Sequence, residues 1–274
     1  MLRLREPRYL GYRDVDRQQP YAKYMKARVD PPQPHVVDAV VAGPVDPTLI
    51  PPPAELPDDL HRPGCSRIET GYGQLPTGEV WVACLTHMPR VEPEMWEWWF
   101  AWHSLESARY KLWHPESHAH ASLRHARPER LDPTDMGSWE GNVSYVDEVI
   151  GGHLDQLAIA PQDPARYGID TSRFDGIAVV GTVGTVLAPV NVGLACHQVR
   201  RVEGGSEMRS RFYLNVPGVR RPDLRAAAHA VRRGVAKPRS PRFKVGFGAD
   251  LLRHCGEEMN HLAQFLPELH AEFS

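Results

Sequence analysis

The segment from Asp250 to Phe265 reads DLLRHCGEEMNHLAQF, and it decides the predicted fold. Its apolar residues recur at intervals of three and four, which is typical of a helix with one buried face. Pro267 follows closely and is predicted to kink the chain. Because several strand-like stretches precede this helix, we predict an α+β architecture in which an antiparallel sheet wraps around a long C-terminal helix.

The strand-like stretches are rich in β-branched residues or alternate apolar and polar residues. They are Glu79–Thr86, Val143–Ile150, Gly176–Leu187, Val190–Val202 and Glu207–Val216, with a hairpin turn predicted at Gly204–Gly205. A helix is predicted from Glu94 to Trp113, because its tryptophans and leucines recur at helical spacing. His114 precedes Pro115, which favours the end of the helix there.

Proline divides the chain into two parts. Twelve of the 26 prolines lie in residues 1–65. Proline fixes φ and donates no backbone hydrogen bond, so this part cannot form a long helix or a central strand. We therefore predict a Pro-rich N-terminal segment or small subdomain over residues 1–70 and a main domain over residues 71–274.

Composition excludes several classes of protein. The 274 residues are 42% hydrophobic and 24% charged, which is typical of a soluble globular protein. Lys and Arg number 32 against 34 Asp and Glu, so no basic excess favours nucleic acid. The four cysteines form no CxxC pair, which argues against a disulfide scaffold. The sequence shows no signal peptide and no uninterrupted membrane span, so we expect a cytoplasmic protein without a membrane partner.

The C-terminal helix carries the first candidate site residues. His254 and Glu258 lie four residues apart and therefore share one helix face. Apolar residues lie on roughly the same face, and burying a histidine and a carboxylate without partners is costly. An exposed ion pair is the alternative interpretation. Glu257 and His261 form a rival pair on adjacent faces, but the apolar neighbours favour Glu258.

Two further features carry candidate metal ligands. The segment Trp113–His120 reads WHPESHAH, and its three histidines either supply imidazole ligands or lie in a polar surface loop. Glu148 alternates with Val146 and Ile150, so one strand face carries a carboxylate between apolar residues. Periodicity alone leaves open whether that face or the opposite one is buried. Two histidines and two carboxylates would suit zinc, although iron(II) and manganese(II) are also chemically suitable.

Three other polar side chains are candidates for contacts with a ligand. His197 lies among apolar strand residues and either faces a cavity or is a core residue. Tyr213 lies opposite the apolar Phe212 and Leu214, which places it outward or in a polar cavity. Tyr110 lies at the end of the tryptophan-rich helix, whose rings suit a core, an interface or a flat apolar ligand.

Separated motifs, in order along the chain, resemble the 2,4-diacetylphloroglucinol hydrolase family, which includes phloretin hydrolase. After the predicted helix Glu94–Trp113 they are WHPESHAHA, GNVSYVDEVIGGHL and RHCGEEMNHLAQFLPELHAEF. The resemblance covers roughly residues 75–274. It implies a helix-grip fold of the birch-pollen-allergen kind. It also implies a hydrolase that cleaves the carbon–carbon bond between a phloroglucinol-type ring and its acyl group, releasing a carboxylic acid.

The resemblance further implies a particular site and a homodimer. One Zn²⁺ ion per chain would be held by His118, Glu148, His254 and Glu258. The substrate, a small aromatic acyl ketone, would be bound and its cleavage assisted by Tyr110, His197 and Tyr213. Where the family pattern has an asparagine just after HxH, this chain has Ala121. The preferred substrate therefore stays open.

Two other classes of protein compete with the hydrolase. A helix-grip protein that only binds apolar ligands would contain no stoichiometric metal. A non-haem iron oxygenase would also use histidine and carboxylate ligands, but it would consume oxygen during turnover.

Overall fold

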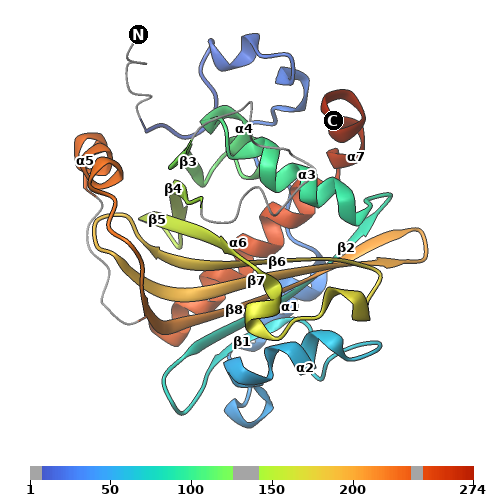
Figure 1. The fold of residues 1–274 in the computed structure, drawn as a ribbon. Coiled ribbons are helices and arrows are strands. Elements are labelled where there is room, and N and C mark those ends of the chain that lie inside the picture. The colour runs from blue at the N-terminus through green and yellow to red at the C-terminus, as the bar shows by residue number, and fades with distance from the viewer. Residues whose placement is uncertain (1–7, 126–141, 236–242) are drawn as a thin grey trace.

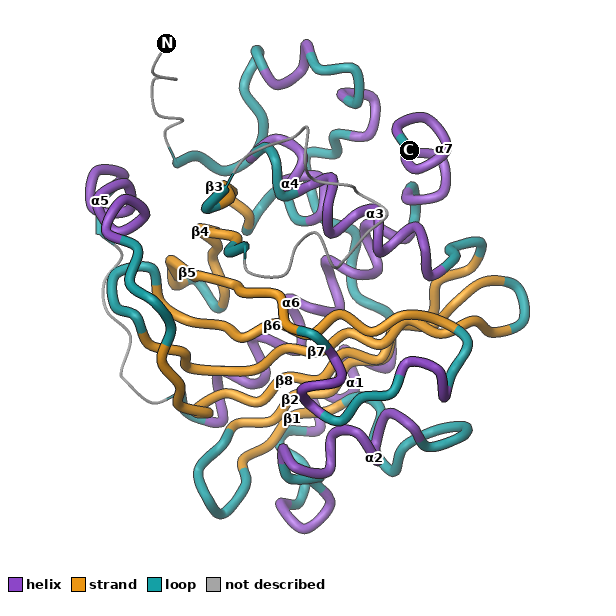
Figure 2. Tube along the Cα trace, in the orientation of Figure 1, coloured by secondary structure: helices purple, strands orange, loops and turns teal. Residues whose placement is uncertain are grey.

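A computed structural model of the chain describes residues 8–125, 142–235 and 243–274. The prediction that no signal peptide begins the chain falls partly on residues 1–7, outside these ranges. The described strands form one eight-stranded antiparallel sheet in the order β1-β2-β8-β7-β6-β5-β4-β3 (Figure 2). They are β1 Gly71–Gln74, β2 Val80–Pro89, β3 His118–Leu123, β4 Ser144–Ile150, β5 His153–Gln162, β6 Gly176–Thr185, β7 Val190–Val202 and β8 Gly205–Val219.

Helices accompany this sheet, which confirms the predicted combination of helices and an antiparallel sheet. They are α1 Pro34–Ala42, α2 Leu56–His61, α3 Pro93–His103, α4 Ser107–Trp113, α5 Leu224–Arg233, α6 Val245–Ala263 and α7 Leu266–Phe273. In Figure 1, α6 passes behind the sheet, and it packs against β1 and β2. The helix ends before Pro267, which lies in the first turn of α7. Within the described ranges, no helix is both long and apolar enough to cross a membrane.

The strands predicted between residues 176 and 216 match β6, β7 and β8 closely. The predicted hairpin turn lies between β7 and β8, where Gly204 is in the turn and Gly205 is the first residue of β8, both with positive φ. A Cβ atom on Gly205 would lie 2.5 Å from the Met88 carbonyl oxygen, so only glycine fits there. The strand β5 was not predicted, because its first half is polar and Pro161 lies near its end.

The single helix predicted over Glu94–Trp113 is wrong. The chain forms α3 and α4 instead, with a break after His103. The Ser104 hydroxyl donates to the Phe100 carbonyl, and Glu106 is extended and accepts a hydrogen bond from Tyr21. These local and tertiary bonds outweigh the helical periodicity, and they allow α4 to pack on β3.

The Pro-rich N-terminal segment packs on both sides of the sheet. Val36 in α1 belongs to the same hydrophobic cluster as the buried face of α6. On the other side, Leu56 and Leu60 of α2 cluster with Trp81 and Tyr213. The buried residues of this segment thus share clusters with the sheet. The division at residue 70 stays a prediction.

Buried ion pairs hold the end of this segment to β8. Arg211 contacts Asp59 at 2.8 Å and Glu69 at 2.7 Å, and Arg209 contacts Glu69 at 2.9 Å. Burial alone would raise the pKa of Glu69, but the two guanidinium groups lower it to about 2. Because both arginines are fully buried, removing either carboxylate would leave a costly unpaired charge.

Candidate metal centre

Three elements bring the four predicted metal ligands together. His118 begins β3 and lies opposite Glu148 of β4 in the strand register. His254 and Glu258 lie one turn apart on the buried face of α6. His118 therefore lies in a strand rather than in the polar loop that was the alternative interpretation, and its cross-strand neighbour is the predicted glutamate ligand.

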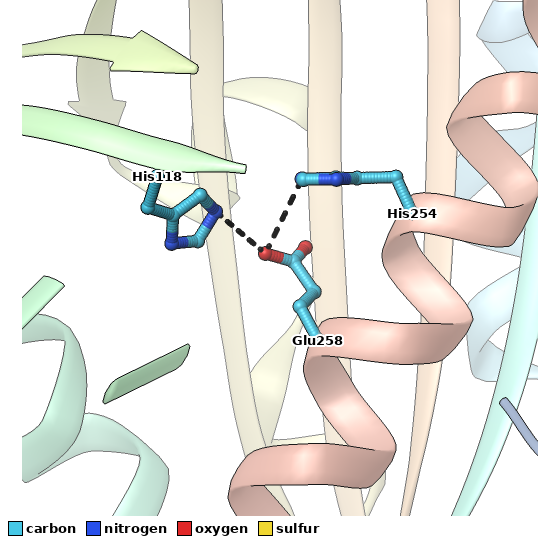
Figure 3. A group of neighbouring side chains, drawn as sticks. All are labelled: His118, His254 and Glu258. Carbon is cyan, nitrogen blue, oxygen red and sulfur yellow. Dashed lines mark ion pairs between the residues drawn. The ribbon is translucent and has the colours of Figure 1, made fainter. Parts of the chain in front are cut away.

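The ligand atoms are within a few ångströms of one another. Nε2 of His118 lies 3.4 Å from Oε2 of Glu258, and Nε2 of His254 lies 3.6 Å from the same oxygen (Figure 3). One donor atom each from His118, His254 and Glu258 falls within a mutual distance of 4.8 Å. Glu148 flanks this group, with Oε2 3.9 Å from Nε2 of His118.

His118 is oriented as a metal ligand would be. Its Nδ1 lies 2.9 Å from the Tyr110 carbonyl, which can only accept, so Nδ1 carries the hydrogen. Its Nε2 is then a lone-pair donor. That atom is buried and has no hydrogen-bond partner among the described residues. A buried, unpartnered lone pair beside two carboxylates fits a bound cation.

The electrostatics of the site also fit a cation. Burial raises the pKa of Glu148 to about 7 and that of Glu258 well above its ordinary value. Burial likewise lowers the pKa of His118 and of His254. In the described part of the chain, the ion pairs of the two glutamates involve only histidines. A divalent cation with two nitrogen and two oxygen ligands would supply the missing positive charge.

A cavity of about 190 Å³ adjoins this cluster. Glu148, His254 and Glu258 contribute to its wall, and most of the remaining wall is apolar. Phe100, Phe212 and Leu214 are examples of the apolar residues. An apolar cavity with a few convergent polar groups is the usual form of a small-molecule site.

Two of the three predicted substrate contacts lie at this cavity. The Tyr110 hydroxyl donates to Oε2 of Glu148 at 2.7 Å. His197 places Nδ1 2.9 Å from the Ser210 hydroxyl, and burial lowers its pKa to about 4, so the ring is neutral near pH 7. Both side chains can therefore contact a ligand beside the group of His118, His254 and Glu258.

The structure places Tyr213 elsewhere. It is fully buried on the opposite face of the sheet, where its hydroxyl donates to the Pro51 carbonyl at 3.0 Å. Successive strand residues face opposite sides, so Phe212 lines the cavity in its place. The substrate contact predicted for Tyr213 is therefore not part of the site that we describe.

The structure also shows where the neighbouring candidates His114, His120 and Ala121 lie. His114 stacks on His254, with ring centroids 4.9 Å apart, and pairs with Glu257 at 3.3 Å. His120 instead lies near the Ser107 and Ser122 hydroxyls. Ala121 packs in the main hydrophobic cluster and is outside the residues that line the cavity.

Among the described polar residues of the cavity wall that sequence reasoning missed, two are ionisable. His103 lies in the last turn of α3, and its position in the helical stripe did not distinguish it from a core residue. Asp155 lies opposite Glu148 in the register of β4 and β5. It was missed because β5 itself was not predicted.

The matching family model and the curated relatives agree on one family. The family model described as the DAPG hydrolase PhiG domain matches residues 52–271. The 2,4-diacetylphloroglucinol hydrolase of a Pseudomonas species is 31% identical, over 94% of this chain and 89% of that protein. The phloretin hydrolase of Eubacterium ramulus is 27% identical, over 96% and 93%. A crystal structure of Ara h 8.0201 matches 57% of this chain and 89% of its own, with a TM-score of 0.32 and 12% identity.

The fold and the site define an α+β protein with a buried histidine–glutamate cluster beside an apolar cavity. The chain belongs to the DAPG hydrolase family. The predicted family and the predicted hydrolase class are thereby confirmed.

Proposed function

We propose that this chain hydrolyses the carbon–carbon bond between a phloroglucinol-type ring and its acyl group. The observation that carries the proposal is the group His118, His254 and Glu258, flanked by Glu148, beside an apolar cavity. The names of the two relatives, 2,4-diacetylphloroglucinol hydrolase and phloretin hydrolase, support this class of substrate. The products would be a carboxylic acid and a phloroglucinol.

The metal in this proposal is one Zn²⁺ ion per chain. His118, Glu148, His254 and Glu258 would hold it, and this mixed nitrogen and oxygen donor set supports zinc. When bound, such a cation supplies Lewis acidity to an acyl carbonyl or to a water molecule. The helix-grip fold, the homodimer and the cytoplasmic location implied by the resemblance stay proposals.

Residues of this chain would orient the reaction. Tyr110 holds Glu148 through its hydroxyl and fixes the tautomer of His118 through its carbonyl. In the keto form of a phloroglucinol ring, the acyl carbonyl is part of a β-diketone. Once water has added to that carbonyl carbon, breaking the carbon–carbon bond leaves the carboxylic acid and expels the ring as an enolate rather than as an aryl anion. The Tyr110 hydroxyl has one hydrogen, which it would donate either to Glu148 or to a ring oxygen of the bound substrate. A hydrogen bond to the ring from Tyr110 or from His197 would stabilise the enolate charge, and one of these groups would return the proton to the ring carbon.

The test uses the purified chain after its metal content has been measured. A panel of acylphloroglucinols is added, and the release of phloroglucinol and carboxylic acid is followed with dissolved oxygen. We expect both products without oxygen uptake. Oxygen consumption coupled to turnover would favour an iron oxygenase. If the chain binds the ligands but neither cleaves them nor contains stoichiometric metal, the result would favour a binding protein.

A further inference from the structure

His103 presents an unused imidazole to the cavity. It is buried in the last turn of α3 and belongs to the cavity wall. Its Nδ1 lies 2.7 Å from the Trp99 carbonyl, so Nδ1 carries the hydrogen and Nε2 is the acceptor. No hydrogen bond within residues 8–125, 142–235 and 243–274 occupies that Nε2. The lone pair is available to a ligand in the cavity.

Aromatic neighbours hold this imidazole in place. The ring stacks on Trp99, with centroids 5.0 Å apart, and on Tyr110, with centroids 5.7 Å apart. Trp113 packs edge-on at 5.2 Å. Burial lowers the pKa of His103 to about 4, so the ring is neutral near pH 7. A fixed, neutral acceptor suits a hydroxyl donor and offers no charge to an anion.

A second imidazole lies nearby in the same wall. Phe100 contacts both His103 and His197, with ring centroids at 6.1 Å and 5.8 Å. Two histidines thus flank one apolar ring in a cavity that is otherwise mostly apolar. A ligand that presents several hydroxyl groups on a flat ring can contact both of them.

We infer that Nε2 of His103 accepts a hydrogen bond from a ring hydroxyl of the substrate, and that His103 and His197 together select polyhydroxylated rings. The inference rests on the proposed function and names the groups that recognise the ring. A site built to bond a substrate hydroxyl discriminates strongly against analogues that lack it, because its own polar group is left unpaired.

The test compares His103→Asn with the wild-type chain. Asparagine keeps an N–H near the Nδ1 position for the Trp99 carbonyl but removes the Nε2 acceptor. The matched control is His35→Asn, since His35 contacts the Leu85 carbonyl outside the cavity wall. We measure kcat/KM for an acylphloroglucinol and for two analogues that each lack one ring hydroxyl. We also measure the Kd of phloroglucinol and the melting temperature.

We expect His103→Asn to lower kcat/KM for the full substrate and to weaken phloroglucinol binding by about tenfold. For at least one analogue the loss should vanish, and His35→Asn should show no loss. A merely structural role would lower kcat/KM equally for all three substrates. That result, or no loss at all, would overturn the inference.

The proposed function and this inference can fail separately. If the wild-type chain binds phloroglucinol more tightly than His103→Asn does but cleaves no acylphloroglucinol, the proposed function fails and the hydroxyl contact stands. If both proteins cleave the full substrate equally well, the inference fails and the function stands. If the wild-type chain neither binds nor cleaves, both are overturned.

Discussion

The ring of Tyr110 lies flat against the ring of His118, with centroids 3.8 Å apart and planes only 2° from parallel. The same tyrosine accepts a hydrogen bond from Nδ1 of His118 and donates one to Glu148. A single residue of α4 therefore orients two candidate ligands on neighbouring strands. Such outer partners commonly fix the tautomer and direction of a metal ligand.

Tyr110→Phe tests this orienting role. The variant keeps the stacked ring and the carbonyl, but Glu148 loses its hydroxyl donor. We expect metal content to persist and kcat/KM for an acylphloroglucinol to fall by about 10- to 100-fold. Tyr110→Ala, which also removes the stacked ring, should lose metal as well. Full activity in Tyr110→Phe and full metal content in Tyr110→Ala would refute the orienting role.

Tyr213→Phe tests the position of the tyrosine on the far face of the sheet. The variant keeps the ring and loses the hydrogen bond to the Pro51 carbonyl. We expect the free energy of unfolding in urea to fall by about 1 kcal/mol and kcat/KM to stay unchanged. A large fall in kcat/KM at unchanged stability would instead show that the hydroxyl reaches the substrate.

The buried His197 ring should make the free energy of unfolding depend on pH in a specific way. Burial lowers its pKa to about 4, whereas an ordinary histidine titrates near 6.5. As the pH falls below about 6.5, the unfolded chain therefore takes up the proton before the folded chain does. The contribution of the neutral His197 ring to the free energy of unfolding is therefore complete above about pH 6.5, and it is lost as the pH falls towards 4.

The wild-type chain loses unfolding free energy between pH 7 and pH 4, and His197→Gln should lose up to about 3 kcal/mol less over the same range. The measurement is the free energy of unfolding in urea at pH 7 and at several values down to 4. The difference between the wild-type chain and the variant should shrink as the pH falls. A difference that is constant over this range would show that His197 does not titrate as its burial predicts.

Gly256→Ala tests the packing of α1 on α6. A Cβ at this position would lie 2.8 Å from Cγ1 of Val36. Alanine favours a helix over glycine by about 1 kcal/mol, but overpacking costs about 1–3 kcal/mol, so we expect a net loss of stability. The control is Gly246→Ala in the first turn of α6, where nothing lies within 4 Å. Equal stabilisation in both variants would argue against the contact.

Patterns that depend on local periodicity predicted much of this fold. The helix around residues 250–265 and the strands between residues 176 and 216 occur as expected, because their buried faces repeat at helix or strand spacing. The break between α3 and α4 could not be predicted, since it depends on a tertiary bond from Tyr21 to Glu106. The strand β3 could not be predicted, because its histidine-rich sequence is typical of a polar loop.

The glutamates of the candidate site were indicated by chemistry that is unusual for their positions, whereas the choice of His118 among the neighbouring histidines came from the family resemblance. Glu148 and Glu258 stood out as carboxylates among apolar residues, and the structure places both beside His118. His103 carried no such signal, because a histidine in a tryptophan-rich helix resembles any core residue. For Tyr213, strand alternation indicated a side opposite Phe212 but could not show that the cavity lies on the Phe212 side.

The central claim is that the cluster around Glu258 holds the metal that carbon–carbon bond hydrolysis requires. Metal content and phloroglucinol release in Glu258→Gln test it most directly, with Glu257→Gln as the matched control on the adjacent helix face. Glutamine keeps the size of the side chain but removes its charge. We predict that Glu258→Gln loses the metal and more than about a hundredfold of its turnover, while Glu257→Gln keeps both. Wild-type metal content and turnover in Glu258→Gln would contradict the account.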